Sequence, residues 1–142
     1  MKKLKKTMII SLVLSLLLVG NVFAIDIKPI VSYKLFDAEA LALSGTADSV
    51  VIDLRYIAAN YNFSIEYTTT GTGTTKIEYL LCSTRGGTYI DAGTDIGSTL
   101  AAGHDILSFT SGEPELAPFM KIRITEDGGA NAVAVTLYLN IQ

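Results

Sequence analysis

Strict alternation of apolar and polar residues is the feature of this sequence that most restricts its fold. The longest alternating segments are residues 25–35, 61–68, 76–81, 120–125 and 133–141. In the last segment, valine, leucine and isoleucine occupy every odd position, while smaller or more polar residues and one tyrosine occupy the even ones. A period of two is typical of strands with one buried face. The sequence therefore predicts extended structure through most of its length.

Shorter segments and turns complete this prediction. Residues 50–54, 88–91 and 106–109 are further strand candidates, and glycine-containing turn signals separate the segments. About seven or eight strands without a long helical pattern predict an all-β chain, folded as a single antiparallel β-sandwich of jelly-roll or immunoglobulin-like type. Residues 37–45, DAEALALSG, fit a two-turn helix capped by Asp37 or a strand, and we prefer the strand.

The first 24 residues have the pattern of a secretory signal peptide. Four lysines precede the apolar run Met8 to Val19, and Val22 and Ala24 are the small residues expected before a cleavage site. We therefore predict cleavage after Ala24, a mature domain of residues 25–142, no membrane span after cleavage, and a periplasmic, cell-surface or extracellular location. The alternative is an uncleaved anchor helix, but the apolar run is shorter than the roughly 18 residues that favour a membrane span.

The net charge restricts the expected binding partners, and the cysteine count restricts the possible disulfides. Loss of the four leader lysines leaves seven basic and 14 acidic residues, a net charge of −7. Nucleic acid and anionic lipid repel such a surface, so neither is expected as a partner. The single cysteine, Cys82, excludes an intramolecular disulfide and is interpreted as a small apolar filler between sheets or at an interface.

The segment YTTTGTGTTKIEY, residues 67–79, resembles a phosphate-binding loop only in its glycines. Such a loop leads into a helix, whereas the residues after Gly73 alternate like a strand. We instead predict a hairpin centred on Gly71. This register places Phe63, Ile65 and Tyr67 opposite Tyr79, Ile77 and Thr75 on one side, with Glu66 opposite Lys76 on the other.

No set of catalytic residues is apparent. His104 is the only histidine and lies in AAGHDIL without a nucleophile pattern, so it is interpreted as a solvent-exposed loop residue and the protein as a non-enzyme. Calcium is the one cofactor considered. Asp91, Asp95 and Asp105 supply loop oxygens suited to this ion, although the D-x-D-x-D-G spacing is missing and aspartate is common in turns.

The seven tyrosines divide by register. Tyr33, Tyr61, Tyr67 and Tyr79 fall on the apolar positions of their strands and are predicted to lie in the core or at its rim. Tyr138 falls on the opposite register between Thr136 and Asn140, and Tyr56 and Tyr89 lie beside turns. Tyr56, Tyr89 and Tyr138 are therefore candidate ligand contacts.

The C-terminal segment AVAVTLYLNIQ is long, apolar and free of proline. At a sheet edge it would offer unpaired backbone groups to another chain. In the middle of a sheet it would already be paired on both sides, and the N-terminal strand, with Lys28 and Pro29, would suit a protected edge. The sequence leaves both placements open.

The segments YNFSIEYTTTGTGTTKIEYLLCSTRGGTYI and APFMKIRITEDGGANAVAVTLYL resemble short uncharacterised β-sandwich proteins of phage virions and environmental bacteria. The resemblance lies in turns and strands, so it implies a fold and little function. Two functions remain open. The first is a secreted structural or assembly subunit of a surface layer or filament, forming a homo-oligomer or polymer through sheet edges. The alternative is a glycan- or small-ligand-binding module, with calcium as a possible aid.

Overall fold

The computed structural model describes residues 30–55, 62–110, 117–128 and 131–141 of the 142-residue chain. The predicted signal peptide, Tyr56 and Tyr61 lie outside these ranges. Nine strands occur in them, and no helix does. They are β1 (Val31–Leu41), β2 (Thr46–Asp48), β3 (Ile52–Asp53), β4 (Asn62–Gly71), β5 (Thr75–Cys82), β6 (Ile90–Leu100), β7 (Gly103–Thr110), β8 (Phe119–Glu126) and β9 (Val133–Ile141).

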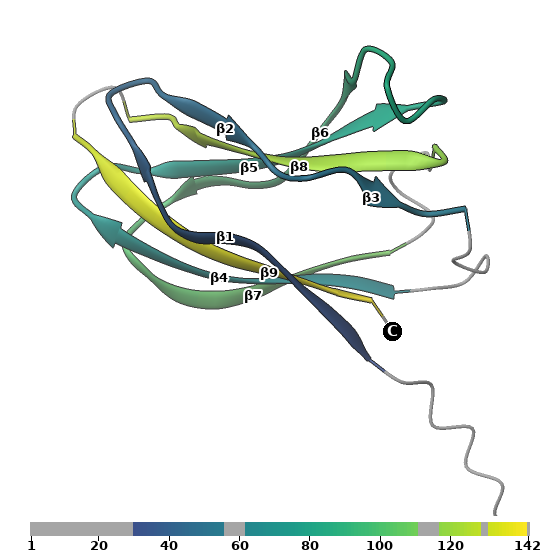
Figure 1. Ribbon diagram of the computed structural model, residues 1–142. Coiled ribbons are helices and arrows are strands. Elements are labelled where there is room, and N and C mark those ends of the chain that lie inside the picture. Colours follow the sequence, from purple (N-terminus) through teal and green to yellow (C-terminus); the bar gives the residue numbers. More distant parts are fainter. Residues whose placement is uncertain (1–29, 56–61, 111–116, 129–130, 142) are drawn as a thin grey trace, which may run out of the picture.

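The strands form two antiparallel sheets packed face to face (Figure 1). Sheet A has the order β1-β9-β4-β7, and sheet B has the order β2-β8-β5-β6, with β3 also paired to β8. This is the strand arrangement of a jelly roll, so the predicted all-β sandwich is confirmed and the immunoglobulin-like alternative does not apply. Only β2–β3 and β5–β6 are consecutive strands within one sheet.

Residues 37–45 contain no helix. Strand β1 continues to Leu41, which is buried, and the chain then turns at Leu43 and Ser44. The Gly45 amide donates to the Ala42 carbonyl across this turn, at 2.9 Å. The preferred strand interpretation is therefore correct as far as Leu41.

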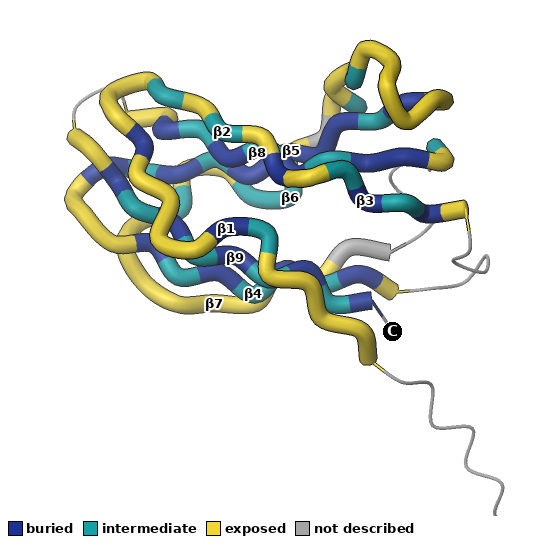
Figure 2. The backbone as a smooth tube through the Cα atoms, viewed as in Figure 1, coloured by how far each residue is buried: buried dark blue, intermediate teal, exposed yellow. Residues whose placement is uncertain are grey.

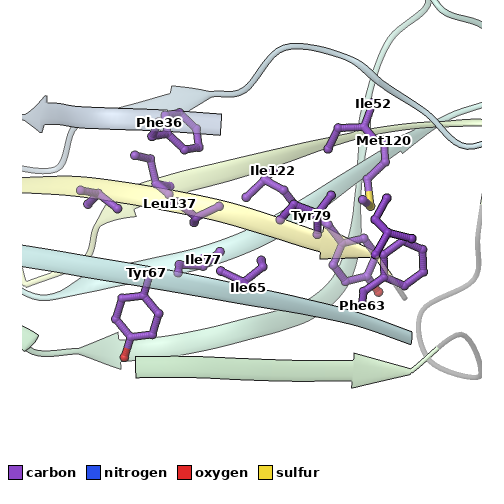
Figure 3. Close-up of a cluster of buried hydrophobic side chains, with 14 of the residues drawn as sticks. Phe36, Ile52, Phe63, Ile65, Tyr67, Ile77, Tyr79, Met120, Ile122 and Leu137 are labelled. Carbon is purple, nitrogen blue, oxygen red and sulfur yellow. The ribbon is translucent and has the colours of Figure 1, made fainter. Parts of the chain in front are cut away.

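The core lies between the sheets and follows the alternation read from the sequence. In β9, the odd-numbered residues Val133 to Ile141 are at most 3% exposed, while the even-numbered ones are half-buried on the outside (Figure 2). Sheet B contributes Ile77 and Tyr79 from β5 and Met120, Ile122 and Ile124 from β8. Figure 3 shows ten labelled side chains of this cluster, drawn from both sheets.

The predicted hairpin between residues 63–67 and 75–79 is wrong. Strand β4 pairs with β7 and β9, whereas β5 pairs with β6 and β8, so the chain crosses between sheets at residues 72–74. Gly73 suits this crossing because a Cβ there would collide with the Asn131 carbonyl oxygen. A strand does follow the glycines, as predicted, and the phosphate-loop interpretation fails.

The sheet order decides between the two placements that the sequence left open for the C-terminal segment. Strand β9 lies between β1 and β4, so it is central, and β1 is the edge strand. One further prediction needs correction. Tyr33 is 45% exposed, because β1 is an edge strand whose first residues sheet B does not cover. Tyr67 and Tyr79 are buried as predicted, at 6% and 2% exposure.

Candidate functional site

The side chains on the outer face of sheet A are brought together by the pairing of its strands, not by a loop. Alternation turns Thr136, Tyr138 and Asn140 outward from the central strand β9. Residues directly opposite one another in an antiparallel sheet share a face, so the pairing of β1, β4 and β7 fixes their neighbours. Three rows across the sheet follow. They are Ser32–Asn140–Ser64–Ser108, then Lys34–Tyr138–Glu66–Ile106, then Thr136–Thr68–His104. We call these eleven residues the polar face.

Tyr138 is central on this face. Its strand neighbours on one row are Lys34 of β1 and Glu66 of β4. The Lys34 ammonium lies 5.8 Å from the centre of the Tyr138 ring, within the range of a cation–π contact. Lys34 is also bonded to Asp37 at 2.5 Å, and this hydrogen bond raises the pKa of the lysine above its ordinary value.

The side chains of Glu66 and His104 on the polar face are exposed to solvent. His104 Nδ1 lies 3.0 Å from the Thr68 hydroxyl, and its Nε2 lies 3.6 Å from Glu66 Oε1. The side chains of His104 and Glu66 are 57% and 41% exposed. His104 lies in strand β7 and not in a loop as predicted. Its exposure to solvent was predicted correctly.

The outer face of sheet B has a different composition. One row runs Asp48–Arg123–Glu78–Asp95 across all four strands. Arg123 binds Asp48 through two hydrogen bonds of 2.6 and 3.1 Å, and Lys76 Nζ lies 2.7 Å from Glu78 and 3.1 Å from Asp95. We call these five residues the charge ladder. Their partners are one another, so little of their bonding capacity is directed at a ligand.

The charge ladder changes the titration of its two cations. Hydrogen bonds to Glu78, and secondarily to Asp95, hold the pKa of Lys76 well above its ordinary value. The hydrogen bonds to Asp48 likewise raise the pKa of Arg123. Both groups therefore stay charged throughout the physiological range.

The three predicted calcium ligands are not brought together. Asp91 and Asp95 lie on β6 in sheet B, whereas Asp105 lies on β7 in sheet A. Asp91 accepts from the Gly93 amide and Asp95 pairs with Lys76. Among the described residues, no three metal-ligating side chains form a group that could hold an ion.

Tyr89 and Cys82 form a separate structural cluster. Tyr89 donates to the Arg85 carbonyl, and the Lys121 ammonium lies 4.8 Å from its ring centre. Cys82 is 8% exposed, but it belongs to the outer side of β5 under the 84–87 turn rather than to the core between the sheets. Burial raises the pKa of Tyr89, with a smaller effect from Cys82. A ligand role for Tyr89 stays a prediction, as it does for Tyr138, and Tyr56 is outside the described residues.

The sheet edges bear on the assembly interpretation. The edge formed by β2 and β3 is made of strands of three and two residues. Strand β6 has three register shifts, with positive φ at Gly93 and Thr99. Strand β7 places the charged Asp105 opposite Tyr67, on the inner side. Short strands, bulges and inward-pointing charges all hinder the addition of another strand.

The comparisons with known proteins concern strand arrangement. No protein-family model and no curated protein matches the sequence. A solved carbohydrate-binding module, CBM36 in complex with calcium and xylotriose, is 12% identical, with a TM-score of 0.44, over 81% of this chain and all of that one. A chain of infectious bursal disease virus, Gx strain, is 14% identical with a TM-score of 0.45, over 80% of this chain and 31% of its own.

A third structure, the CBM28 module specific for non-crystalline cellulose, is 12% identical with a TM-score of 0.38, over 78% of this chain and 71% of that one. The sandwich fold follows from this chain's own strand order, and the resemblance to β-sandwich proteins of phage virions and environmental bacteria stays a prediction. At such scores and identities the comparisons do not indicate a ligand, and the functional argument below depends on this chain's own residues. No helix among the described residues is long and apolar enough to span a membrane.

Proposed function

We propose that this protein is an exported, non-enzymatic binding module that takes an uncharged glycan on the polar face of sheet A. The observation that carries the proposal is the position of Tyr138. Its half-buried ring lies in a central strand, surrounded by polar groups from all four strands of the sheet. An aromatic ring held in this way offers an apolar surface to the C–H groups of a sugar and a hydroxyl to its oxygens.

The row beside Tyr138 suits hydroxyl groups. Ser32, Asn140, Ser64 and Ser108 span all four strands, and each side chain both donates and accepts hydrogen bonds. With strands about 4.8 Å apart, this row is roughly 14 Å long. A ligand that carries hydroxyls at intervals along its length fits the row better than a compact ligand would.

The charge of the polar face favours a neutral ligand. The lysine and the glutamate of its middle row balance each other. The whole chain, by contrast, has a net charge of −3. A polyanion would be repelled by the molecule and a polycation would be drawn to other surfaces, so neither fits the polar face as well as an uncharged chain.

Binding without cleavage fits the same residues. Most glycosidases place two carboxyl groups on either side of one bond. Within the rows of the polar face, Glu66 is the single carboxylate, and His104 Nε2 lies 3.6 Å from its Oε1. These groups are suited to hold hydroxyls rather than to act as a paired acid and nucleophile.

The test is substitution of Tyr138, with binding to a panel of neutral soluble polysaccharides measured by affinity electrophoresis and calorimetry. Tyr138→Ala is expected to weaken binding about tenfold or more, whereas Tyr138→Phe retains the ring and most of the affinity. Tyr89→Ala, in the separate cluster on the sheet B side, is the matched control and should bind normally. Equal affinity of Tyr138→Ala and the parent protein, or no binding to any member of the panel, would refute the proposal.

A further inference from the structure

The start of β1 differs from the other strand edges described above. Residues 31–34 pair with residues 141–138 without interruption, and the first register shift comes only after Lys34. Three apolar residues are exposed here, Ile30 at 61%, Val31 at 43% and Tyr33 at 45%. Beyond Lys34 the strand becomes irregular, with Ala38 at a φ of 50°. A regular and apolar edge of this kind is the type to which another strand can add.

The side chains of this segment are sorted by face. Val31 and Tyr33 lie opposite Ile141 and Leu139, which are core residues, so they are on the inner side of sheet A. Ser32 lies opposite Asn140 and belongs to the polar face. The exposure of Val31 and Tyr33 means that sheet B leaves the inner side open at this end of β1.

We propose that this edge binds a second copy of the chain, with the two β1 segments antiparallel across a twofold axis. The pairing we infer places Ser32 opposite Ser32 of the second copy and Val31 opposite Tyr33 of the second copy. Both apolar pairs then lie on the inner side, and a β-branched residue next to an aromatic one is a favourable cross-strand pair. Lys34 falls opposite Ile30, so no like charges meet.

Charge and symmetry favour a second copy as the occupant. The molecule is acidic overall, but residues 30–34 contain one lysine and no acidic side chain, so a contact through this segment brings no acidic groups of the two copies together within it. A twofold contact uses the same segment on both molecules and closes on itself. A filament would need two different open edges, and the remaining edges are short, bulged or charged on the inner side. The inferred assembly is therefore a closed dimer.

The dimer has a consequence for the polar face that rests on the proposed glycan function. The row from Ser108 to Ser32 continues directly into the same row of the second copy. The two Tyr138 residues lie three strand spacings apart across the joined sheet and four residues apart along it, so roughly 20 Å separates them on one continuous surface. A single extended glycan could then contact both copies and bind with avidity.

Sedimentation velocity of the protein, purified after export from an expressing cell, tests the dimer without any ligand. We expect a reversible monomer–dimer equilibrium. V31K/Y33K opposes lysines in both apolar pairs and should weaken dimerisation at least about tenfold. V31E/Y33K instead opposes an acidic to a basic side chain in both pairs, and dimerisation should return. Val50→Lys is the control, since it adds the same charge at a residue that is 71% exposed elsewhere.

Each outcome decides the matter. A protein that stays monomeric at high concentration, forms open-ended polymers, or dimerises unchanged in V31K/Y33K contradicts the proposal. Failure of V31E/Y33K to restore the dimer contradicts the antiparallel register. Circular dichroism shows whether each variant is folded. Tyr138→Ala separates the two proposals, because its dimerisation should be normal whether or not the protein binds a glycan.

Discussion

The two outer faces of the sandwich use polar residues in opposite ways. On sheet B, the charge ladder joins five side chains into ion pairs, and Glu78 at its middle has a side chain only 10% exposed. On sheet A, most residues of the polar face are uncharged, and Glu66 and His104 remain 41% and 57% exposed. Both faces cover the same core. The difference indicates that one face contributes to stability and the other is available for contact.

The two faces also differ in which side chains surround the residues of their middle strands. Arg123, Glu78 and Lys76 come from the two middle strands of sheet B, β8 and β5, where neighbouring strands restrict access. Tyr138 also lies in a middle strand, but its neighbours are short or neutral side chains, apart from Lys34 and Glu66. A surface whose groups are already bonded to one another gains little by binding a polar ligand, because each new hydrogen bond replaces an existing one.

The largest expected change is in the free energy of unfolding, on substitution of Leu137, the residue before Tyr138 in β9. Leu137 is fully buried, and Leu137→Ala should lower the free energy of unfolding by about 3 kcal/mol because it leaves a cavity. Tyr138→Ala, one residue away on the other side of the strand, should cost about 1 kcal/mol or less. Urea unfolding followed by circular dichroism measures both. Similar losses for the two variants would contradict the division of β9 into a core side and a contact side.

A matched pair of lysine substitutions compares the two faces directly. Lys76→Met removes the cation between Glu78 and Asp95, which pair directly across β5 and β6, and should cost about 2 kcal/mol at neutral pH. Lys34→Met, on the polar face, should leave the urea midpoint unchanged, since Lys34 and Asp37 are both exposed.

For glycan affinity we expect the opposite order, with a larger change in Lys34→Met than in Lys76→Met. Lys76→Met lies on the far sheet and should keep the affinity of the parent protein for a neutral glycan, whereas Lys34→Met alters the surroundings of the Tyr138 ring and should change that affinity. The comparison fails if the two variants are equally stable, or if Lys76→Met is the one that impairs binding.

Alternation in the sequence was enough to assign side chains to faces but not to assign strands to partners. It correctly placed Phe63, Ile65 and Leu137 inside and Tyr138 outside. Alternation could not show that the chain crosses to the other sheet after β4 instead of forming a hairpin between β4 and β5. The hairpin and the crossing bury the same residues. The crossing depends on β9, the last strand of the chain, which pairs with one side of β4.

The candidate site was missed for the same reason. Tyr138 and its strand neighbour Asn140 were identified from their register, but Lys34 and Glu66 come from two other strands whose order no local pattern reveals. The tyrosine at residue 33 shows the converse error. Its register is that of the core, and its exposure follows from the limited extent of the opposite sheet, which alternation does not report.

The smallest effect concerns alkaline pH and distinguishes the charge ladder from an ordinary surface. Because its folded-state pKa is raised above the ordinary value of 10.5, Lys76 stabilises the fold fully below that pH. Above that pH the unfolded chain loses the proton while the folded chain keeps it, so the contribution declines and is lost as the pH rises through the higher folded-state pKa. The stability difference between the parent protein and Lys76→Met should therefore be constant from pH 7 to about 10 and shrink above that range. Urea midpoints at pH 7, 9, 10 and 11 measure this difference. If this stability difference already narrows between pH 7 and 9, the effect of Lys76 arises from packing or from other titrating groups. That result would contradict an electrostatic stabilisation of sheet B by the charge ladder.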